Sequence, residues 1–292
     1  MTLRPHILVV NGRKVRQPVF VIGAPHSGVD LLARALKRSP GFHLTFGQPA
    51  VISVVYAFAR SPSIQRGRGE AAATVLRDAL AQGWQVTPHG CLGCSAVCRE
   101  AGGVNGAGTC VAEHDIRRYG DASPDLMYCA ESLVDAFPDA RLVQIIRDGR
   151  DVVAAMLADP EAMAWFRPGV ANVDSEFPNP FFGVETEPDL AAWPNLSPAA
   201  KCALRWRGCV RAMARLRRSM PAERLTTLRY EQVIQEPAAA AGAVSGFVEA
   251  EVASIAVRDC VPPGGWRRAL SPQQVTDVEQ VAGSDLRRVG YS

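Results

Sequence analysis

The sequence predicts an α/β fold with a P-loop-like parallel sheet flanked by helices and a cysteine-rich insertion. Three short, apolar, β-rich segments are each followed by a segment with helical periodicity, and no internal repeat is present. The strands are expected at Pro18–Gly23, Leu142–Ile146 and Arg224–Tyr230. Such alternation is typical of parallel sheets, which bind ligands at the carboxyl ends of their strands. The 292 residues, 48% of them hydrophobic, fit one domain spanning 1–292.

Helical patterns account for much of the remaining chain. Residues 28–38 place four apolar side chains on one face before Ser39-Pro40 ends the helix. A long helix is expected from Ser197-Pro198, with Cys202 and Trp206 in its apolar stripe and its arginines, Arg205 among them, on solvated faces. Further helices are expected at Val51–Arg60, at Glu70–Gln82, between Pro124 and Phe137, from Gly149, from Glu231, and at the C-terminal end.

Two segments lack periodicity. Residues 84–120 are rich in glycine and cysteine and are predicted to be an insertion within the domain. Residues 160–196 are rich in proline and aromatic residues and are predicted to be an irregular lid or substrate loop.

Charge and hydropathy exclude several classes of protein. The net charge is +3 and basic residues are interleaved with acidic ones, so no nucleic-acid partner is expected. No apolar run approaches the roughly 18 residues that a membrane span needs. The N-terminal residues lack a signal-peptide pattern. We therefore expect a cytoplasmic protein with no membrane partner.

The loop from Gly23 to Gly28, GAPHSG, has the spacing of a phosphate-binding loop. Its backbone N–H groups at a helix start can point at an anion, and the helix dipole favours negative charge there. The lysine and hydroxyl of a Walker A motif are absent, because Val29 and Asp30 follow Gly28. ATP or GTP hydrolysis is therefore not expected, and a purely structural turn stays the alternative on this stretch alone.

Three further segments follow in order. IIRDGRD places Arg147 and Arg150 at the end of the second strand, where guanidinium groups can grip phosphate. LRYEQVIQEP follows the third strand, and GGWRRAL precedes the last helix. Together the four segments resemble the sulfotransferase family that uses 3′-phosphoadenosine 5′-phosphosulfate (PAPS), in its bacterial and Golgi-type branch.

This resemblance implies a metal-free transfer of a sulfuryl group from PAPS to a hydroxyl or amine of a small-molecule acceptor. The first loop would hold the 5′-phosphosulfate, the second motif the 3′-phosphate, and the tail loop would cover the nucleotide. The positions that the resemblance assigns to PAPS, or to its product 3′-phosphoadenosine 5′-phosphate (PAP), are Pro25, His26, Ser27, Gly28, Val29, Asp30, Arg147, Arg150, Ala155, Tyr230, Trp266, Arg267 and Arg268.

Several positions depart from the family pattern. His26 stands where the family has a basic residue, and Val29 and Asp30 replace its two hydroxyls. Ala155 replaces a serine that contacts the 3′-phosphate, and Gln48 replaces a glutamate that serves as general base in some members. Two interpretations follow: a sulfotransferase with altered phosphate contacts, or a relative that lost or changed its donor and binds a nucleotide or metabolite or senses a metal.

The loss of the glutamate leaves the general base open, because an amide cannot take a proton. The candidate catalytic residues are His26, which a nearby phosphate would favour in its protonated form, His43, which precedes Gly47-Gln48-Pro49, and Asp30, provided that it faces the acceptor. For His43, a partly exposed loop histidine without a catalytic task is the plainer alternative.

A group of cysteines lies within the predicted insertion. Cys91, Cys94, Cys98 and Cys110 have the spacing C-x2-C-x3-C-x11-C. Four thiolates can bind zinc tetrahedrally, and a structural Zn²⁺ would stabilise a segment with little apolar core. We predict zinc here, with an iron–sulfur cluster, disulfides or unligated thiols as alternatives.

Overall fold

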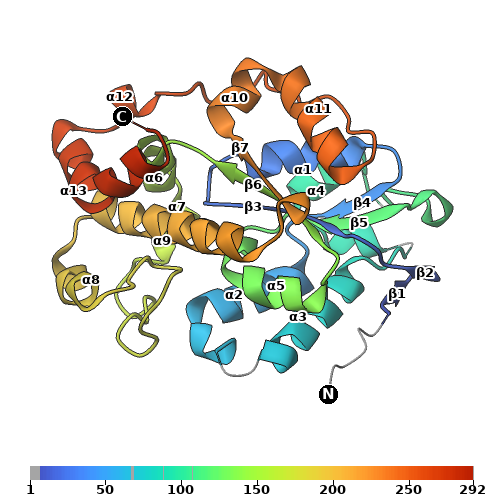
Figure 1. Ribbon diagram of the computed structural model, residues 1–292, viewed down its shortest axis with the longest axis horizontal. Coiled ribbons are helices and arrows are strands. Elements are labelled where there is room, and N and C mark those ends of the chain that lie inside the picture. Colours follow the sequence, from blue (N-terminus) through green and yellow to red (C-terminus); the bar gives the residue numbers. More distant parts are fainter. Residues whose placement is uncertain (1–6, 67–68, 88, 107, 292) are drawn as a thin grey trace.

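The computed structural model describes residues 7–66, 69–87, 89–106 and 108–291. Its centre is a parallel sheet with the strand order β4-β5-β3-β6-β7, which confirms the predicted fold class (Figure 1). Its strands are β3 (Val19–Gly23), β4 (Phe42–Thr45), β5 (Arg118–Asp121), β6 (Arg141–Ile146) and β7 (Leu225–Arg229). A separate antiparallel pair joins β1 (Val9–Val10) to β2 (Arg13–Lys14).

Helices cover both faces of the sheet and form a three-layer arrangement (Figure 1). One face packs against α2 (Pro49–Arg60), α3 (Gly69–Gly83), α5 (Ala130–Ala136), α6 (Gly149–Leu157), α9 (Pro198–Ser219) and α13 (Pro272–Arg288). The other packs against α1 (Val29–Arg38), α4 (Ala96–Ala101), α10 (Tyr230–Gln235) and α11 (Pro237–Val248). The shorter helices are α7 (Pro160–Ala164), α8 (Glu187–Ala192) and α12 (Trp266–Ala269), with 3₁₀ turns η1 (Pro62–Ile64), η2 (Gly90–Gly93), η3 (Glu113–Asp115), η4 (Leu126–Cys129), η5 (Trp193–Asn195) and η6 (Ala222–Arg224).

The central strand β3 explains why the sheet needs helices on both sides. Val19 and Val21 belong to the core under α1 and α11, whereas Phe20 and Ile22 belong to the core under α2 and α9. All four are at most 1% exposed. Because successive strand residues point to opposite faces, a continuous apolar run buries both faces.

Two strands of the central sheet, and the short pair β1 and β2, were not predicted. β4 and β5 are four residues each, and β5 (RYGD) lies at the end of the predicted insertion. Their polar residues hide the strand pattern, but β5 pairs with β3 on one side and with β4 on the other, and both strands are largely buried. Tyr119 is 2% exposed, and its ring packs at a tilt against that of Trp84. The non-periodic insertion is therefore shorter than predicted at its carboxyl end.

The arginines of α9 also differ from expectation. Arg205 is 1% exposed, and one terminal nitrogen donates to both Asp125 oxygens at 2.7 and 2.8 Å. Arg207 is buried and pairs with Asp189 at 2.6 Å. The prediction of a fully solvated arginine face was wrong at these two positions, because Asp125, which precedes η4, and Asp189, in α8, pack against the helix and neutralise them.

The segment 160–196 contains α7, α8 and a cluster of aromatic rings. Trp165 packs edge-on against Phe181 at 5.3 Å, and Phe166 and Phe182 pack against Trp193. This cluster forms a small core of its own over the carboxyl end of α2. Within the part of the chain that the structure describes, no helix is both long and apolar enough to cross a bilayer.

Candidate functional site

The loop from Gly23 to Gly28 lies at the carboxyl end of β3 and leads into α1. Gly28 has φ +97°, and a Cβ there would lie 2.7 Å from the Tyr230 ring, so glycine is needed for both backbone and space. Ser27 is fully buried and its hydroxyl donates to the Ala24 carbonyl at 2.6 Å. The first N–H groups of α1 have no carbonyl within the helix to bind, which leaves donors for an anion.

His26 is exposed at the crest of this loop, with φ +57°. Its Nε2 lies 3.1 Å from Oδ2 of Asp159, the residue that caps α7. A carboxylate only accepts hydrogen bonds, so this contact assigns the proton to Nε2 and leaves Nδ1 as the basic nitrogen of the neutral ring. No local pattern predicted this pairing, because 133 residues separate the two side chains.

Arg147 at the end of β6 is 4% exposed and faces the same loop. Its Nη1 donates to the His26 carbonyl at 3.0 Å, and its guanidinium lies 4.2 Å from the centre of the Tyr230 ring. Its Nε is buried and has no hydrogen-bond partner in the described chain. A buried donor without a partner is costly, and an anionic ligand would relieve that cost.

Arg150 lies three residues farther on but has different neighbours. Its Nε and Nη2 bind the Asp148 carboxylate at 3.0 and 2.8 Å, and Nη1 reaches Glu279 at 3.3 Å. The hydrogen bonds with Asp148 raise the pKa of Arg150. The guanidinium also stacks on Trp266 at 4.4 Å. Its charge is therefore already balanced by carboxylates.

The tail loop is fastened to α6 by Asp151, a residue that sequence reasoning did not single out. Its carboxylate accepts from the backbone N–H of Gly264 and of Trp266, both at 2.8 Å. Tyr230 ties the other end of the loop, because its hydroxyl donates to the Val261 carbonyl at 2.8 Å. Arg267 stacks on Trp266 at 4.5 Å and is exposed.

The other residues predicted to bind PAPS lie near the phosphate loop, Arg147 and the tail loop. Asp30 is exposed in the first turn of α1 and raises the pKa of Cys260 in the tail segment, together with the larger effect of burial. Asp30 is therefore close enough to the tail segment for its charge to act on Cys260. Pro25, Val29 and Ala155 are half-buried and Arg268 is exposed.

His43 lies apart from this group. It is 4% exposed within β4, with its ring edge-on to Tyr119 and its Nδ1 3.9 Å from the sulfur of Cys110. Burial, with a smaller contribution from Lys37, lowers the pKa of His43 to about 4. Because it is buried beside the cysteines, its position gives no support to a role as base at the acceptor.

Asp121, at the carboxyl end of β5, is a buried carboxylate that sequence reasoning missed. It is fully buried, accepts from the Thr45 hydroxyl at 2.6 Å and from the Ser123 N–H at 2.8 Å. Burial raises its pKa to about 6 despite these hydrogen bonds. The signal available in the sequence was the polar residue just after a strand, but that strand was itself not predicted.

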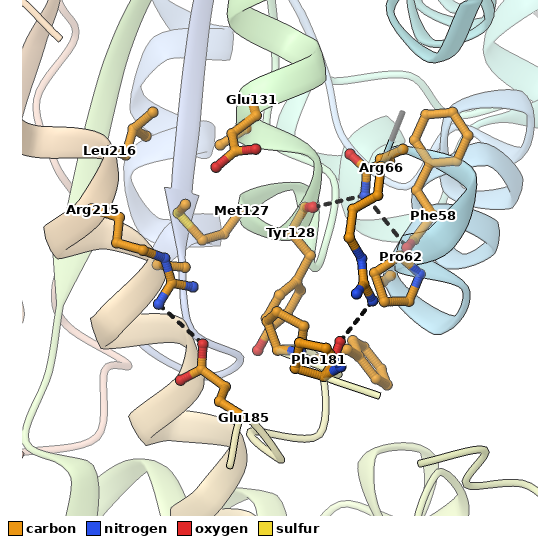
Figure 2. A pocket seen from close by; sticks show the side chains of 16 residues that line it. Phe58, Pro62, Arg66, Met127, Tyr128, Glu131, Phe181, Glu185, Arg215 and Leu216 are labelled. Carbon is orange, nitrogen blue, oxygen red and sulfur yellow. Dashed lines mark hydrogen bonds and ion pairs between the residues drawn. The ribbon is translucent and has the colours of Figure 1, made fainter. Parts of the chain in front are cut away.

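A separate cavity of about 330 Å³ lies between α2, η4, α9 and the segment 178–185 (Figure 2). Its walls are apolar at Phe58, Met127 and Phe181, and at its rim Arg215 pairs with Glu185 at 3.0 Å. None of the residues predicted to bind the donor lines it. The segment predicted to be a lid or substrate loop therefore forms one wall of a cavity distinct from the phosphate loop.

The four clustered cysteines are all reduced. The backbone N–H of Cys110 donates to the sulfur of Cys91 at 3.3 Å, and hydrogen bonding with Cys94 lowers the pKa of Cys98 to about 6. Among the residues whose positions are described, no three or more His, Cys, Asp or Glu side chains are placed to hold a metal ion. The predicted zinc site, and the alternative iron–sulfur cluster, therefore find no support in the geometry.

Comparison with known proteins gives one clear match. Residues 18–176, more than half of the chain, match the model of the sulfotransferase family. No curated protein sequence matches the chain significantly.

Several solved structures are similar at low sequence identity. The sulfotransferase domain of the olefin synthase from Synechococcus PCC 7002 has 16% identity and a TM-score of 0.49, over 92% of this chain and 94% of that chain. The sulfotransferase from Alicyclobacillus acidocaldarius has 16% identity and a TM-score of 0.48, over 94% of each chain. Mouse sulfotransferase SULT7A1, solved with PAP, has 12% identity and a TM-score of 0.44, over 94% of this chain and 86% of that chain.

Proposed function

Because this chain belongs to the sulfotransferase family, we propose that it transfers a sulfuryl group from PAPS to a hydroxyl or amine of a small-molecule acceptor. The observation that carries the proposal is the buried Arg147, which binds the backbone of the Gly23–Gly28 loop and whose Nε has no hydrogen-bond partner among the described residues. Loop amides and this guanidinium form a preorganised anion site that needs no reorientation during the reaction.

The 5′-phosphosulfate is held by the loop. The N–H groups of Gly28, Val29 and Asp30 start α1 and face the anion, and Arg147 supplies the positive charge. As the bond from sulfur to the 5′-phosphate oxygen breaks, negative charge grows on the departing phosphate. The same fixed dipoles stabilise that charge, so the loop favours the transition state over the bound donor.

The 3′-phosphate lies near the tail loop, with Arg267 and Arg268 as its exposed cations. Arg150 is bound to Asp148 and Glu279, so it acts as a positioning residue that stacks on Trp266 and orders the loop. Asp151 supports the same loop through two backbone N–H groups. Arg267 and Arg268 thus supply positive charge for the 3′-phosphate, although Ala155 cannot offer the hydroxyl of the serine that it replaces.

His26 acts as the general base. Asp159 holds its Nε2–H, which orients the ring and leaves Nδ1 to accept the acceptor's proton. The acceptor oxygen or nitrogen then forms its bond to sulfur, and the bond to the 5′-phosphate breaks on the opposite side. A base oriented by a carboxylate is the arrangement that such a transfer needs.

Calorimetry with PAP tests the donor assignment. We expect PAP to bind the wild type and Arg147→Ala to weaken that binding about 10- to 100-fold, since a hydrogen bond to a charged group contributes about 1.5–3 kcal/mol. Arg218→Ala, which removes an exposed arginine at the end of α9, is the matched control and should bind as the wild type does. Absence of binding at millimolar PAP would overturn the assignment and favour a relative that changed its donor.

The role of His26 is tested by the rate of PAP formation from PAPS with a panel of phenol and amine acceptors. His26→Ala should lower the rate about 10²- to 10⁴-fold, and Asp159→Asn should lower it less, with PAP affinity nearly unchanged in both. His26→Arg should hold or raise PAP affinity but abolish transfer. A collapse of PAP affinity in His26→Ala would show that the imidazole binds the donor instead.

A further inference from the structure

The cavity between α2, η4, α9 and residues 178–185 has no task in the proposed transfer (Figure 2). Its volume is about 330 Å³, whereas the closely packed interior of a protein contains few voids larger than a water molecule. Binding sites for small molecules begin at about 300 Å³. His26, Arg147 and Asp159 do not line the cavity, so a molecule bound there would lie apart from the phosphate loop.

The inner wall of the cavity consists of aromatic rings and a thioether. Phe58, Met127 and Phe181 are at most 3% exposed, and the Tyr128 ring packs edge-on against Phe181 at 5.3 Å. Figure 2 shows these four side chains around one space. Aromatic rings and a polarisable sulfur interact favourably with a further ring, beyond the area that they bury. The wall therefore favours a flat aromatic ligand.

Polar contacts hold the rim of the cavity in place before any ligand binds. The Gln65 side chain donates to the carbonyls of Phe58 and Tyr128 at 3.4 and 3.2 Å, which ties η1 to α2 and η4. Nη2 of Arg66 donates to the Pro178 carbonyl at 2.8 Å, which ties the same turn to the segment 178–185. A preformed site loses little conformational entropy on binding, so even a small ligand can be held there.

Four charged side chains surround the opening, and two of them lack a counter-charge. Arg215 is paired with Glu185 at 3.0 Å. Arg66 binds only the neutral Pro178 carbonyl, and the Glu131 carboxylate forms neither an ion pair nor a hydrogen bond with any described residue. Figure 2 shows these two side chains on different walls, Glu131 from α5 and Arg66 from the segment after η1. A ligand with one charge would meet a like charge here, whereas a zwitterion meets an opposite charge on both walls.

We propose that this cavity is a second binding site, which takes an aromatic amino acid with a free ammonium and a free carboxylate. The ring lies against Phe58, Met127 and Phe181. The carboxylate accepts from Nε and Nη1 of Arg66, which have no partner among the residues that the structure describes, and the ammonium donates to Glu131. The ligand is bound and released unchanged, because the groups that carry the transfer lie elsewhere.

The proposed site shares a wall with a buried ion pair. The Phe181 ring lies 4.1 Å from the guanidinium of Arg205, which binds Asp125, and the Tyr128 hydroxyl donates to the Arg205 carbonyl at 3.4 Å. A ring in the cavity therefore packs against the side chains that hold α9 to the segment after β5. Because such a ligand binds the folded chain alone, it should also raise the midpoint of thermal unfolding.

Calorimetry of the full-length protein with three probes tests the proposal. L-Tryptophan carries both charges, indole-3-propionate lacks the ammonium, and tryptamine lacks the carboxylate. L-Tryptophan should bind about three- to tenfold more tightly than either of the others and should raise the unfolding midpoint. Its affinity should be the same with and without PAP. Absence of L-tryptophan binding at millimolar concentration would overturn the proposal. So would its displacement by PAP or its sulfation in the presence of PAPS, because both would place it at the transfer site.

Four variants locate the site and assign the two charges. Arg66→Gln should weaken L-tryptophan and indole-3-propionate about three- to tenfold and leave tryptamine unchanged, and Glu131→Gln should weaken L-tryptophan and tryptamine instead. Ala212→Leu fills the cavity and should abolish binding of all three probes. Ala214→Leu, at a half-buried position of α9 that does not line the cavity, is its matched control and should bind as the wild type does. Wild-type affinity in Ala212→Leu, or equal weakening of all three probes by Arg66→Gln, would contradict the assignment.

Discussion

The loop after β3 and the cysteine segment 84–117 reach their shapes by different means. β3 is paired on both sides, by β5 and β6, and its residues are almost fully buried. Among its described residues, the cysteine segment contains the short elements η2, α4 and η3, and its apolar side chains Leu92 and Val97 are exposed. Trp84 and Ile116, at its two ends, are buried in the core beside the sheet, whereas the buried residues described between them are chiefly Cys91, Cys98 and Ala101.

In the phosphate loop, the residues that carry the chemistry are not the ones that hold the fold together. In the cysteine segment, the same residues do both. The sheet fixes the backbone of the phosphate loop, so side chains such as His26 can change while the amides keep their positions. In the cysteine segment the thiols are themselves the core, so any reaction at sulfur alters the packing. Departures from a family pattern are therefore tolerated in the phosphate loop. In the cysteine segment they change the structure.

A large effect on the backbone of the phosphate loop is expected from Gly28→Ala. The new Cβ would lie 2.7 Å from the Tyr230 ring, and φ +97° is unfavourable for alanine. The loop must shift, and a displacement of this kind costs about 100-fold in PAP affinity or transfer rate. Gly242→Ala in α11, where nothing lies within 4 Å, is the control. Wild-type PAP binding by Gly28→Ala would show that the backbone of this loop is not the anion site.

The same contrast explains what the sequence could predict. β3 and β6 are mainly apolar and buried throughout, so their positions and the residues at their carboxyl ends followed from the pattern alone. β7 (LTTLR) is an edge strand, and its leucine and threonine residues made it predictable. β4 and β5 are short and carry His43, Arg118 and Asp121, so only their neighbours make them strands. Partners such as Asp159 for His26, or Asp151 for the tail loop, depend on which loops the fold brings together, and no local pattern encodes that.

An effect of similar size is expected in the pH dependence of stability. Burial raises the pKa of Asp121 to about 6 from an ordinary 3.8. The folded chain thus binds this proton more tightly than the unfolded chain. The stability that the protonated Asp121 gives the folded chain is fully present below about pH 4 and is lost as the pH rises through about 6. The free energy of unfolding should fall by on the order of 3 kcal/mol across this window.

Denaturant unfolding from pH 4 to pH 7 measures this dependence. Asp121→Asn should remove the fall, and Asp78→Asn, at an exposed position of α3, should keep it. A fall of equal size in wild type and Asp121→Asn would assign it to other groups. A charge on Cys98 also raises the pKa of Asp121, although less than burial does, so the window should move downward in Cys98→Ser.

The smallest effect tests whether the two regions are independent. Ser95 caps α4 by accepting from the Cys98 N–H at 3.1 Å and donates to the Phe46 carbonyl before α2. Ser95→Ala should lower the free energy of unfolding by about 1 kcal/mol and speed amide hydrogen exchange in residues 91–98. Ser284→Ala, at an exposed position of α13, should do neither. Since the sheet alone fixes the phosphate loop, PAP affinity should not change in Ser95→Ala; a drop would show that the cysteine segment helps to hold the loop.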